Sequence, residues 1–157
     1  MKTKLGLSLV ALALLTSSLA IAADESKLDG VMCLLQGKKT VNAEKSAKYK
    51  EGKVYFCCDG CLGKYEKMTA EEKTKLASKA NSQLVASKQY AQKACPFTGG
   101  KLNDEMKVSV NGAEVKFCCG NCKGKAEKME ADEQLDKVFS DAAFEKGKFT
   151  AVKPDKK

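Results

Sequence analysis

Apolar and polar residues alternate in two short stretches of the chain, and each stretch ends at a run of cysteines. In the later stretch, residues 108–110 and 115–117 alternate on either side of Asn111-Gly112. Asn-Gly favours a tight turn because both central residues of such a turn need a positive φ. The earlier stretch, residues 53–56, follows Glu51-Gly52 in the same way. The pattern therefore predicts a β-hairpin at each place.

The alternation stops after each cysteine run, which indicates that a helix begins there. Residues 69–72 read Thr-Ala-Glu-Glu, the form of a capping box, and predict a helix from about Ala70 to about Ala80. A further helix is predicted over residues 131–144. Residues 83–93 fit either a continued helix or a strand that leads to Cys95, and we expect the strand.

The two stretches belong to a tandem repeat. Residues 54–68 and 115–129 align at an offset of 61, and 10 of the 15 aligned positions are identical. An upstream cysteine and glycine also match, at an offset of 62: Cys33 and Gly37 with Cys95 and Gly99. Each copy is therefore expected to form one supersecondary unit.

The chain contains 8 cysteines, and the repeat divides them into two tetrads. The first is Cys33, Cys57, Cys58 and Cys61, and the second is Cys95, Cys118, Cys119 and Cys122. A helix that opens at the cysteine run would hold its cysteines on one face, and the hairpin would return the upstream cysteine to them. A helix N-terminus also lowers thiol pKa values and favours metal capture. Four thiols suit a closed Zn(II) site or Cu(I), which prefers two or three soft ligands.

Two other uses of these cysteines remain open. Linking Cys33 to Cys57 or Cys58 by a disulfide would close a loop of about 25 residues and stabilise the fold by roughly 3 kcal/mol. A zinc site contributes more, about 10–16 kcal/mol of apparent binding energy, and this favours metal where metal is available. A thiol–disulfide oxidoreductase could use a Cys-x-x-Cys pair, but the βαβ context of that class is missing.

The N-terminal residues predict export. Lys2 and Lys4 precede an apolar run from Leu5 to Ala20, and Ala20-Ile21-Ala22 supplies small residues for cleavage after Ala22. The run is too short for a membrane span, so none is expected after cleavage. Residues 1–22 are thus interpreted as a signal peptide, and the mature protein is expected to be periplasmic or secreted.

The mature chain has room for two very small modules, predicted at residues 23–81 and 82–150, with a disordered basic tail at 151–157. Modules of about 60 residues usually need a metal or disulfides for stability. The chain has no His, which excludes catalytic triads and His-ligated zinc, so we expect no enzyme. Its net charge of +8 comes from lysines interleaved with acidic residues, and this pattern does not favour specific nucleic-acid binding.

The arrangement resembles the TRASH and YHS-like heavy-metal-binding domains, in which a lone cysteine and a hairpin precede Cys-x-x-x-Cys at a helix start. Cys33, Cys57 and Cys61 match this pattern, as do the corresponding residues of the second copy, Cys95, Cys118 and Cys122. The resemblance implies a small α+β fold of two tandem treble-clef-like modules, each a β-hairpin followed by a helix. It also implies metal sensing, delivery or sequestration with a metal-transport or metal-resistance partner protein. Cys58 and Cys119 are additions to the family's three-cysteine core.

Overall fold

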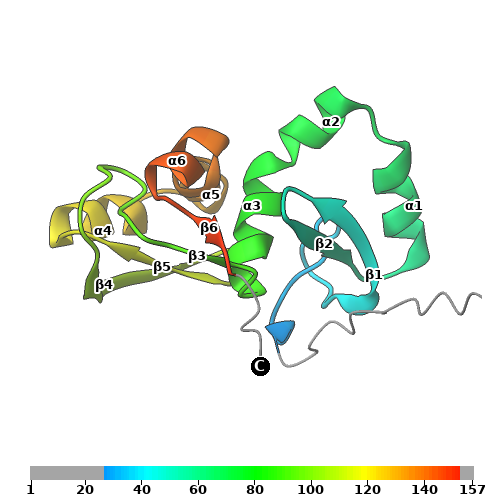
Figure 1. Cartoon of the computed structure of the whole chain (residues 1–157), viewed down its shortest axis with the longest axis horizontal. Helices are drawn as coiled ribbons and strands as arrows, with labels where there is room; N and C mark the ends of the chain where they lie inside the picture. The colour runs from blue at the N-terminus through cyan, green and yellow to red at the C-terminus, as the bar shows by residue number, and fades with distance from the viewer. Residues whose placement is uncertain (1–26, 153–157) are drawn as a thin grey trace, which may run out of the picture.

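A computed structural model describes residues 27–152, which form a small α+β structure of short antiparallel sheets and helices (Figure 1). The first copy contains β1 (Asn42–Tyr49), β2 (Gly52–Phe56), α1 (Asp59–Lys67), α2 (Ala70–Lys75) and α3 (Ala77–Ala86). The second contains β4 (Asn103–Val110), β5 (Ala113–Phe117), α4 (Gly120–Glu127), α5 (Ala131–Phe139) and α6 (Asp141–Lys146). A third sheet pairs β3 (Tyr90–Ala91) with β6 (Thr150–Ala151). The predicted signal peptide lies outside the described residues.

Both predicted hairpins are present, and each is followed by a helix. Asn111 and Gly112 form the second turn with φ values of 49° and 81°, as the Asn-Gly pair predicts. The first turn is at Lys50-Glu51, one residue earlier than expected, because Gly52 already pairs with Tyr49 in the sheet.

Gly52 instead allows β2 to lie close to α3 and to the segment that follows α3. A Cβ at this position would lie 2.6 Å from Oε1 of Gln89 and 2.9 Å from Cδ2 of Leu84. Such a contact cannot form without a shift of these side chains, so Gly52 is explained by the space available and not by the turn.

The capping box is confirmed, but the helix that follows it differs from the prediction. Thr69 N donates to Oε2 of Glu72 at 2.8 Å, and Glu72 N donates to Oγ1 of Thr69 at 3.3 Å. The helix is interrupted at Leu76 and resumes as α3, which runs to Ala86. The strand expected from residue 83 is therefore wrong, and within 83–93 only Tyr90–Ala91 is extended in a sheet.

Burial explains this error. Residues 80–84 of α3 are all at most 4% exposed, so the helix is enclosed on several sides and lacks the amphipathic pattern of a surface helix. Without this pattern, a short apolar segment such as Leu84-Val85 fits a strand as well as it fits a helix.

The C-terminal part also departs from the prediction at two points. The helix expected over 131–144 is divided at Ser140, whose Oγ accepts from Ala143 N at 3.4 Å and begins α6. Ala151 belongs to β6 and Val152 N donates to Gln89 O at 2.8 Å, so the predicted tail begins too early. The rest of the predicted tail, 153–157, lies outside the described residues.

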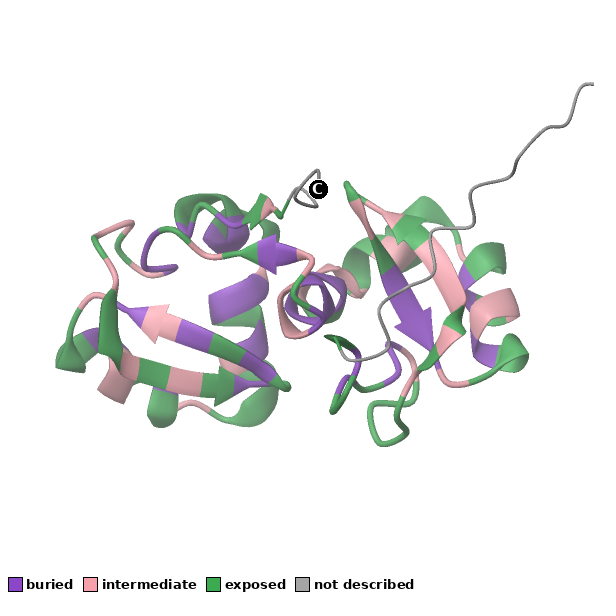
Figure 2. Cartoon of the chain, turned by 60° about the horizontal axis from the view of Figure 1, so that its bottom comes forward, coloured by how far each residue is buried: buried purple, intermediate pink, exposed green. Residues whose placement is uncertain are grey.

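The two copies have separate hydrophobic clusters, and α3 lies between them (Figures 1 and 2). Ala80 of α3 packs in the first cluster with Phe56 and Tyr65, while Leu84 packs in the second with Phe117 and Phe139. The boundary predicted between residues 81 and 82 thus falls within a helix that both cores share.

Polar contacts also join the copies at α3. Asn81 is 0% exposed, and its Nδ2 donates to Phe139 O at 2.8 Å and to Oδ1 of Asp141 at 3.0 Å. Its Oδ1 accepts from the Tyr49 hydroxyl at 3.2 Å. Lys50, in the first hairpin turn, forms an ion pair with Asp141 at 2.8 Å.

This ion pair makes stability depend on pH. The Lys50 ammonium and then the Asn81 amide lower the pKa of the Asp141 carboxyl. A lowered folded-state pKa stabilises the protein above the carboxyl's ordinary pKa, and the stabilisation is lost as the pH falls through the lowered value. We expect Asp141→Asn to reduce the free energy of unfolding near neutral pH by at most about 1 kcal/mol, as for exposed ion pairs. The difference from wild type should disappear in acid.

Urea unfolding of both proteins between about pH 7 and pH 3 measures this difference. Other groups that titrate over this range affect both proteins alike, so the difference between them reports Asp141. A difference that grows as the pH falls would contradict the assignment.

Candidate metal centres

Each upstream cysteine begins a tight turn that a glycine closes. Gly37 N donates to Cys33 O at 2.8 Å, and Gly99 N donates to Cys95 O at 2.7 Å. Gly37 and Gly99 have φ values of 61° and 74°, a conformation that residues with a side chain rarely adopt. The same turn therefore forms in both copies, although the first lacks the proline that follows Cys95.

The remaining cysteines lie where each hairpin passes into a helix. β2 ends at Phe56, Cys58 is the extended N-cap residue of α1, and Cys61 lies in the first turn of the helix. Cys119 and Cys122 occupy the same positions at α4. The prediction that a helix opens at each cysteine run is confirmed. Cys57 precedes the N-cap, so the fold of the junction, not a helical face, brings it to Cys61.

The structure brings three sulfurs together in each copy. The Sγ atoms of Cys33, Cys57 and Cys61 all lie within 4.8 Å of one another, as do those of Cys95, Cys118 and Cys122. Cys57 and Cys61 are 3.8 Å apart, and Cys118 and Cys122 are 3.6 Å apart. We call these two groups the first and second triads.

Cys58 and Cys119 lie outside the triads but next to them. The Sγ atom of Cys58 is 3.8 Å from that of Cys57, and the Sγ atom of Cys119 is 3.7 Å from that of Cys118. Both are exposed to solvent, whereas the upstream and helical members of the triads are buried. Each triad thus has one accessible thiol beside it.

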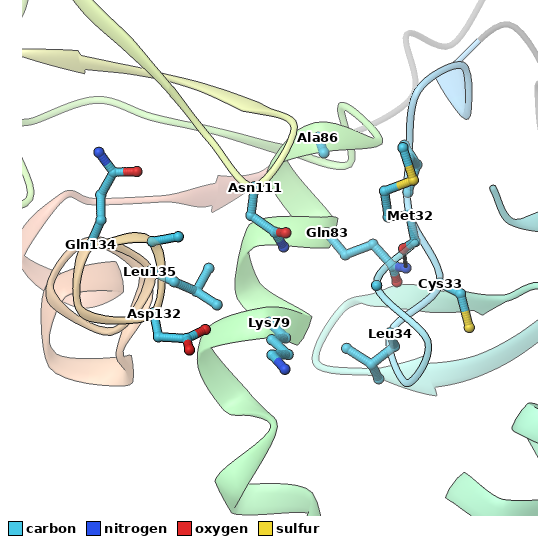
Figure 3. A pocket seen from close by; sticks show the side chains of 13 residues that line it. Met32, Cys33, Leu34, Lys79, Gln83, Ala86, Asn111, Asp132, Gln134 and Leu135 are labelled. Carbon is cyan, nitrogen blue, oxygen red and sulfur yellow. Dashed lines mark hydrogen bonds between the residues drawn. The ribbon is translucent and has the colours of Figure 1, made fainter. Parts of the chain in front are cut away.

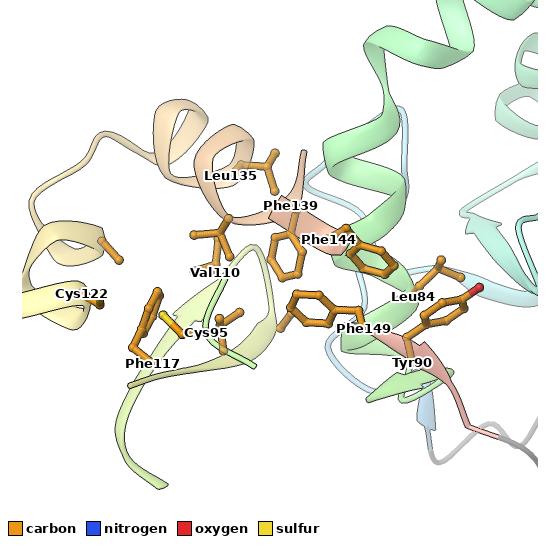
Figure 4. Close-up of a cluster of buried hydrophobic side chains, with 14 residues drawn as sticks. Leu84, Tyr90, Cys95, Val110, Phe117, Cys122, Leu135, Phe139, Phe144 and Phe149 are labelled. Carbon is orange, nitrogen blue, oxygen red and sulfur yellow. The ribbon is translucent and has the colours of Figure 1, made fainter. Parts of the chain in front are cut away.

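The buried cysteines of each triad belong to the hydrophobic cluster of their own copy. Cys33 and Cys61 pack with Phe56 and Tyr65 in the first. In the second, Cys95 and Cys122 lie around Phe117 (Figure 4). Apolar surroundings exclude water from the sulfurs, which strengthens their interaction with a cation.

The thiols of each copy differ in how readily they ionise. Burial alone would raise the pKa of Cys95, but the Thr98 hydroxyl and the backbone N–H of Cys118 outweigh it and lower the pKa to about 7. Backbone N–H groups, that of Gln36 foremost, likewise overcome burial and lower the pKa of Cys33. The upstream cysteines are therefore prepared to bind as thiolates.

The helix start has the opposite effects on its two cysteines. The backbone N–H of Cys61 lowers the pKa of Cys58, and that of Cys122 lowers the pKa of Cys119. Burial, followed by the neighbouring thiols, raises the pKa of Cys61 to about 12. A metal ion would reverse this last effect, because its charge favours the thiolate, so binding releases protons.

All eight cysteines lie within the described part of the chain, and no two of them are joined by a disulfide there. The separations between neighbouring sulfurs, 3.6–3.8 Å, are far above the length of a disulfide bond, about 2.05 Å. They agree with the edge of a tetrahedron of sulfurs around zinc, about 3.8 Å for a Zn–S bond of about 2.3 Å. The sulfurs within each cluster are thus close enough together to hold a metal ion.

Residues other than cysteine also contribute to the sites, and little in the sequence pattern indicates them. The Thr98 hydroxyl lies 3.3 Å from Sγ of Cys118, and its place in the turn after Cys95 is the one available signal. Gln83 and Gln92 bond to the backbone beside the triads. Neither has a counterpart in the other copy, so the repeat could not reveal them.

Within residues 27–152, no helix combines the length and apolar character that crossing a membrane requires. Comparison with protein-family models, curated proteins and solved structures finds no match to the chain. Its function therefore has to be inferred from the two cysteine clusters themselves.

Proposed function

We propose that this protein binds soft metal ions, one in each cysteine triad. The observation that carries the proposal is the convergence of three sulfurs, at spacings that suit a thiolate metal site, in two places. Each triad joins a turn to a helix start across a hairpin, so a bound ion would cross-link parts of the fold that are distant in sequence.

The donor set favours Zn(II) or Cu(I). Three thiolates satisfy Cu(I), whereas Zn(II) in a closed site takes four ligands. Cys58 and Cys119 are the proposed fourth ligands for Zn(II), since each Sγ atom already lies within 3.8 Å of a triad member. Their exposure would make them the part of each site that is most open to exchange with another thiol.

The arrangement of a hairpin followed by a helix in each copy supports a more specific proposal, a treble-clef-like fold related to the TRASH and YHS-like domains. On this basis we propose a non-enzymatic role in metal sensing, delivery or sequestration, with a metal-transport or metal-resistance protein as partner. Export to the periplasm or beyond, inferred from residues 1–22, belongs to the same proposal.

Metal analysis of the protein, purified anaerobically and without chelators, tests the proposal. We expect about two equivalents of metal per chain, one for each triad. Less than half an equivalent, together with no titratable thiols, would instead favour a protein held by disulfides.

A further inference from the structure

One glutamine side chain connects the two halves of the first triad. Oε1 of Gln83, in α3, accepts from Tyr55 N at 2.7 Å, and its Nε2 donates to Tyr55 O at 3.0 Å. The same Nε2 donates to Met32 O at 2.8 Å. Tyr55 is two residues before Cys57, and Met32 directly precedes Cys33. Figure 3 shows the Gln83 amide reaching from α3 to the loop that carries Met32 and Cys33.

A second glutamine makes the same three bonds at the second triad. Oε1 of Gln92 accepts from Lys116 N at 2.9 Å, and its Nε2 donates to Lys116 O at 2.8 Å and to Ala94 O at 2.9 Å. Lys116 is two residues before Cys118, and Ala94 directly precedes Cys95. The amide therefore bridges strand and turn at corresponding places in both copies.

The duplication does not account for this likeness. Gln83 and Gln92 are only nine residues apart, whereas the parts of the two sites are 61 or 62 residues apart. Gly30 occupies the position in the first copy that corresponds to Gln92. Two unrelated positions thus supply the same bridge, which indicates that the bridge itself is needed at each site.

The bridge uses both N–H donors of the amide and its carbonyl oxygen. A glutamine offers two N–H donors and one carbonyl acceptor, and Gln83 directs both donors and its acceptor to the backbone. Gln83 is 4% exposed, so water does not compete for these bonds. A buried amide with three bonds to the backbone fixes the distance between the strand that leads to Cys57 and the turn that carries Cys33.

We propose that Gln83 and Gln92 are positioning residues, which set the spacing of the thiols in each triad before a metal ion binds. The inference rests on the proposed metal-binding function. It also makes the sites unequal, because Gln83 is held by α3, which packs against both copies, while Gln92 lies beside its own site. Groups of this kind, beyond the ligands themselves, typically change metal affinity by about 10–100-fold when they are replaced.

Gln83→Met tests the proposal, since methionine keeps the length and helix propensity of glutamine but removes all three bonds. In chelator competition we expect one of the two metal equivalents to bind about 10–100-fold more weakly. Gln92→Met should weaken the other equivalent to a similar degree. With Co(II) as the probe, the visible absorption of the affected site should change as its thiolate geometry loosens.

Gln89→Met is the matched control. Gln89 pairs with Lys53 N and O on the same strand, at 2.7 Å for both bonds, but it does not reach a cysteine turn. We expect Gln89→Met to bind both equivalents with wild-type affinity. If Gln83→Met and Gln89→Met lowered the metal affinity equally, the three bonds of Gln83 would have no special role at the triad. This result would overturn the proposal.

A metal-free measurement separates this inference from the proposed function. Cys33 is 2% exposed, so its alkylation in reduced, metal-free protein requires the turn to open. We expect alkylation of Cys33 to be about tenfold faster in Gln83→Met than in wild type or Gln89→Met, the factor expected from losing one or two net hydrogen bonds. A wild type that binds no metal would refute the proposed function alone. Unchanged alkylation of Cys33 in Gln83→Met would refute the positioning role.

Discussion

Replacing Cys61 by Ser is expected to remove one of the two metal equivalents and to destabilise the first copy around its triad. Cys61 is buried and shares the triad with Cys33 and Cys57, so serine leaves only two triad thiols and the exposed Cys58, with a hard, weakly ionising hydroxyl in the buried position. A structural zinc site contributes about 10–16 kcal/mol of apparent binding energy, so its loss should lower the urea midpoint of unfolding strongly. Metal content, and urea unfolding followed by far-UV circular dichroism, measure the two losses.

The duplication supplies the controls for this experiment. Cys122→Ser should remove the other equivalent and leave the first triad loaded. Cys58→Ser, in the same cysteine run but outside the triad, should retain both equivalents and bind one of them less tightly. Two equivalents in Cys61→Ser would show that Cys61 is not a ligand, and loss of metal from Cys58→Ser but not from Cys61→Ser would contradict the assignment of the triad.

Leu84→Ala is expected to cost about 2–5 kcal/mol of unfolding free energy, the range for removing a fully buried leucine. Leu84 is 0% exposed and packs in the cluster of the second copy, while α3, which carries it, also packs against the first. The cavity would therefore loosen the helix on which both copies depend. Urea unfolding of metal-loaded protein, at one fixed metal concentration, measures the change.

Val85→Ala is the matched control, because Val85 is the next residue of α3 and is only partly buried against the same cluster. We expect it to cost clearly less than Leu84→Ala, at most about 1 kcal/mol, since less apolar surface is lost from the core. Equal costs would mean that α3 does not hold Leu84 in the shared core as the structure shows.

The features that could be predicted from the sequence are those set by local chemistry. Asn111-Gly112 determines a turn by itself because of the φ values it tolerates, and Thr69 and Glu72 cap a helix through bonds between near neighbours. The repeat grouped the cysteines correctly into two sets, since a duplicated unit folds in the same way twice. Six of the eight form two separate groups of three in the structure, and the sulfurs of each group are close enough to bind one metal ion.

The features that could not be predicted depend on contacts between distant residues. Gln83 bonds to Met32, 51 residues away, and to Tyr55, 28 residues away, and no local pattern reports such a partner. Because α3 is buried on several sides, its sequence lacks a clear helical periodicity, and a strand was expected within residues 83–93. The first turn was expected at Glu51-Gly52 and lies at Lys50-Glu51, because Gly52 allows a close packing contact and does not adopt a positive φ.

Native mass spectrometry of the wild-type protein, purified from its own host and kept anaerobic, tests the central claim most directly. It reports metal identity, the number of bound ions and the number of disulfides together, because each disulfide removes two hydrogens from the mass. The account predicts two soft metal ions per chain and eight alkylatable thiols after the metal is removed by a chelator. A chain with no metal and a mass lowered by four disulfides would contradict it.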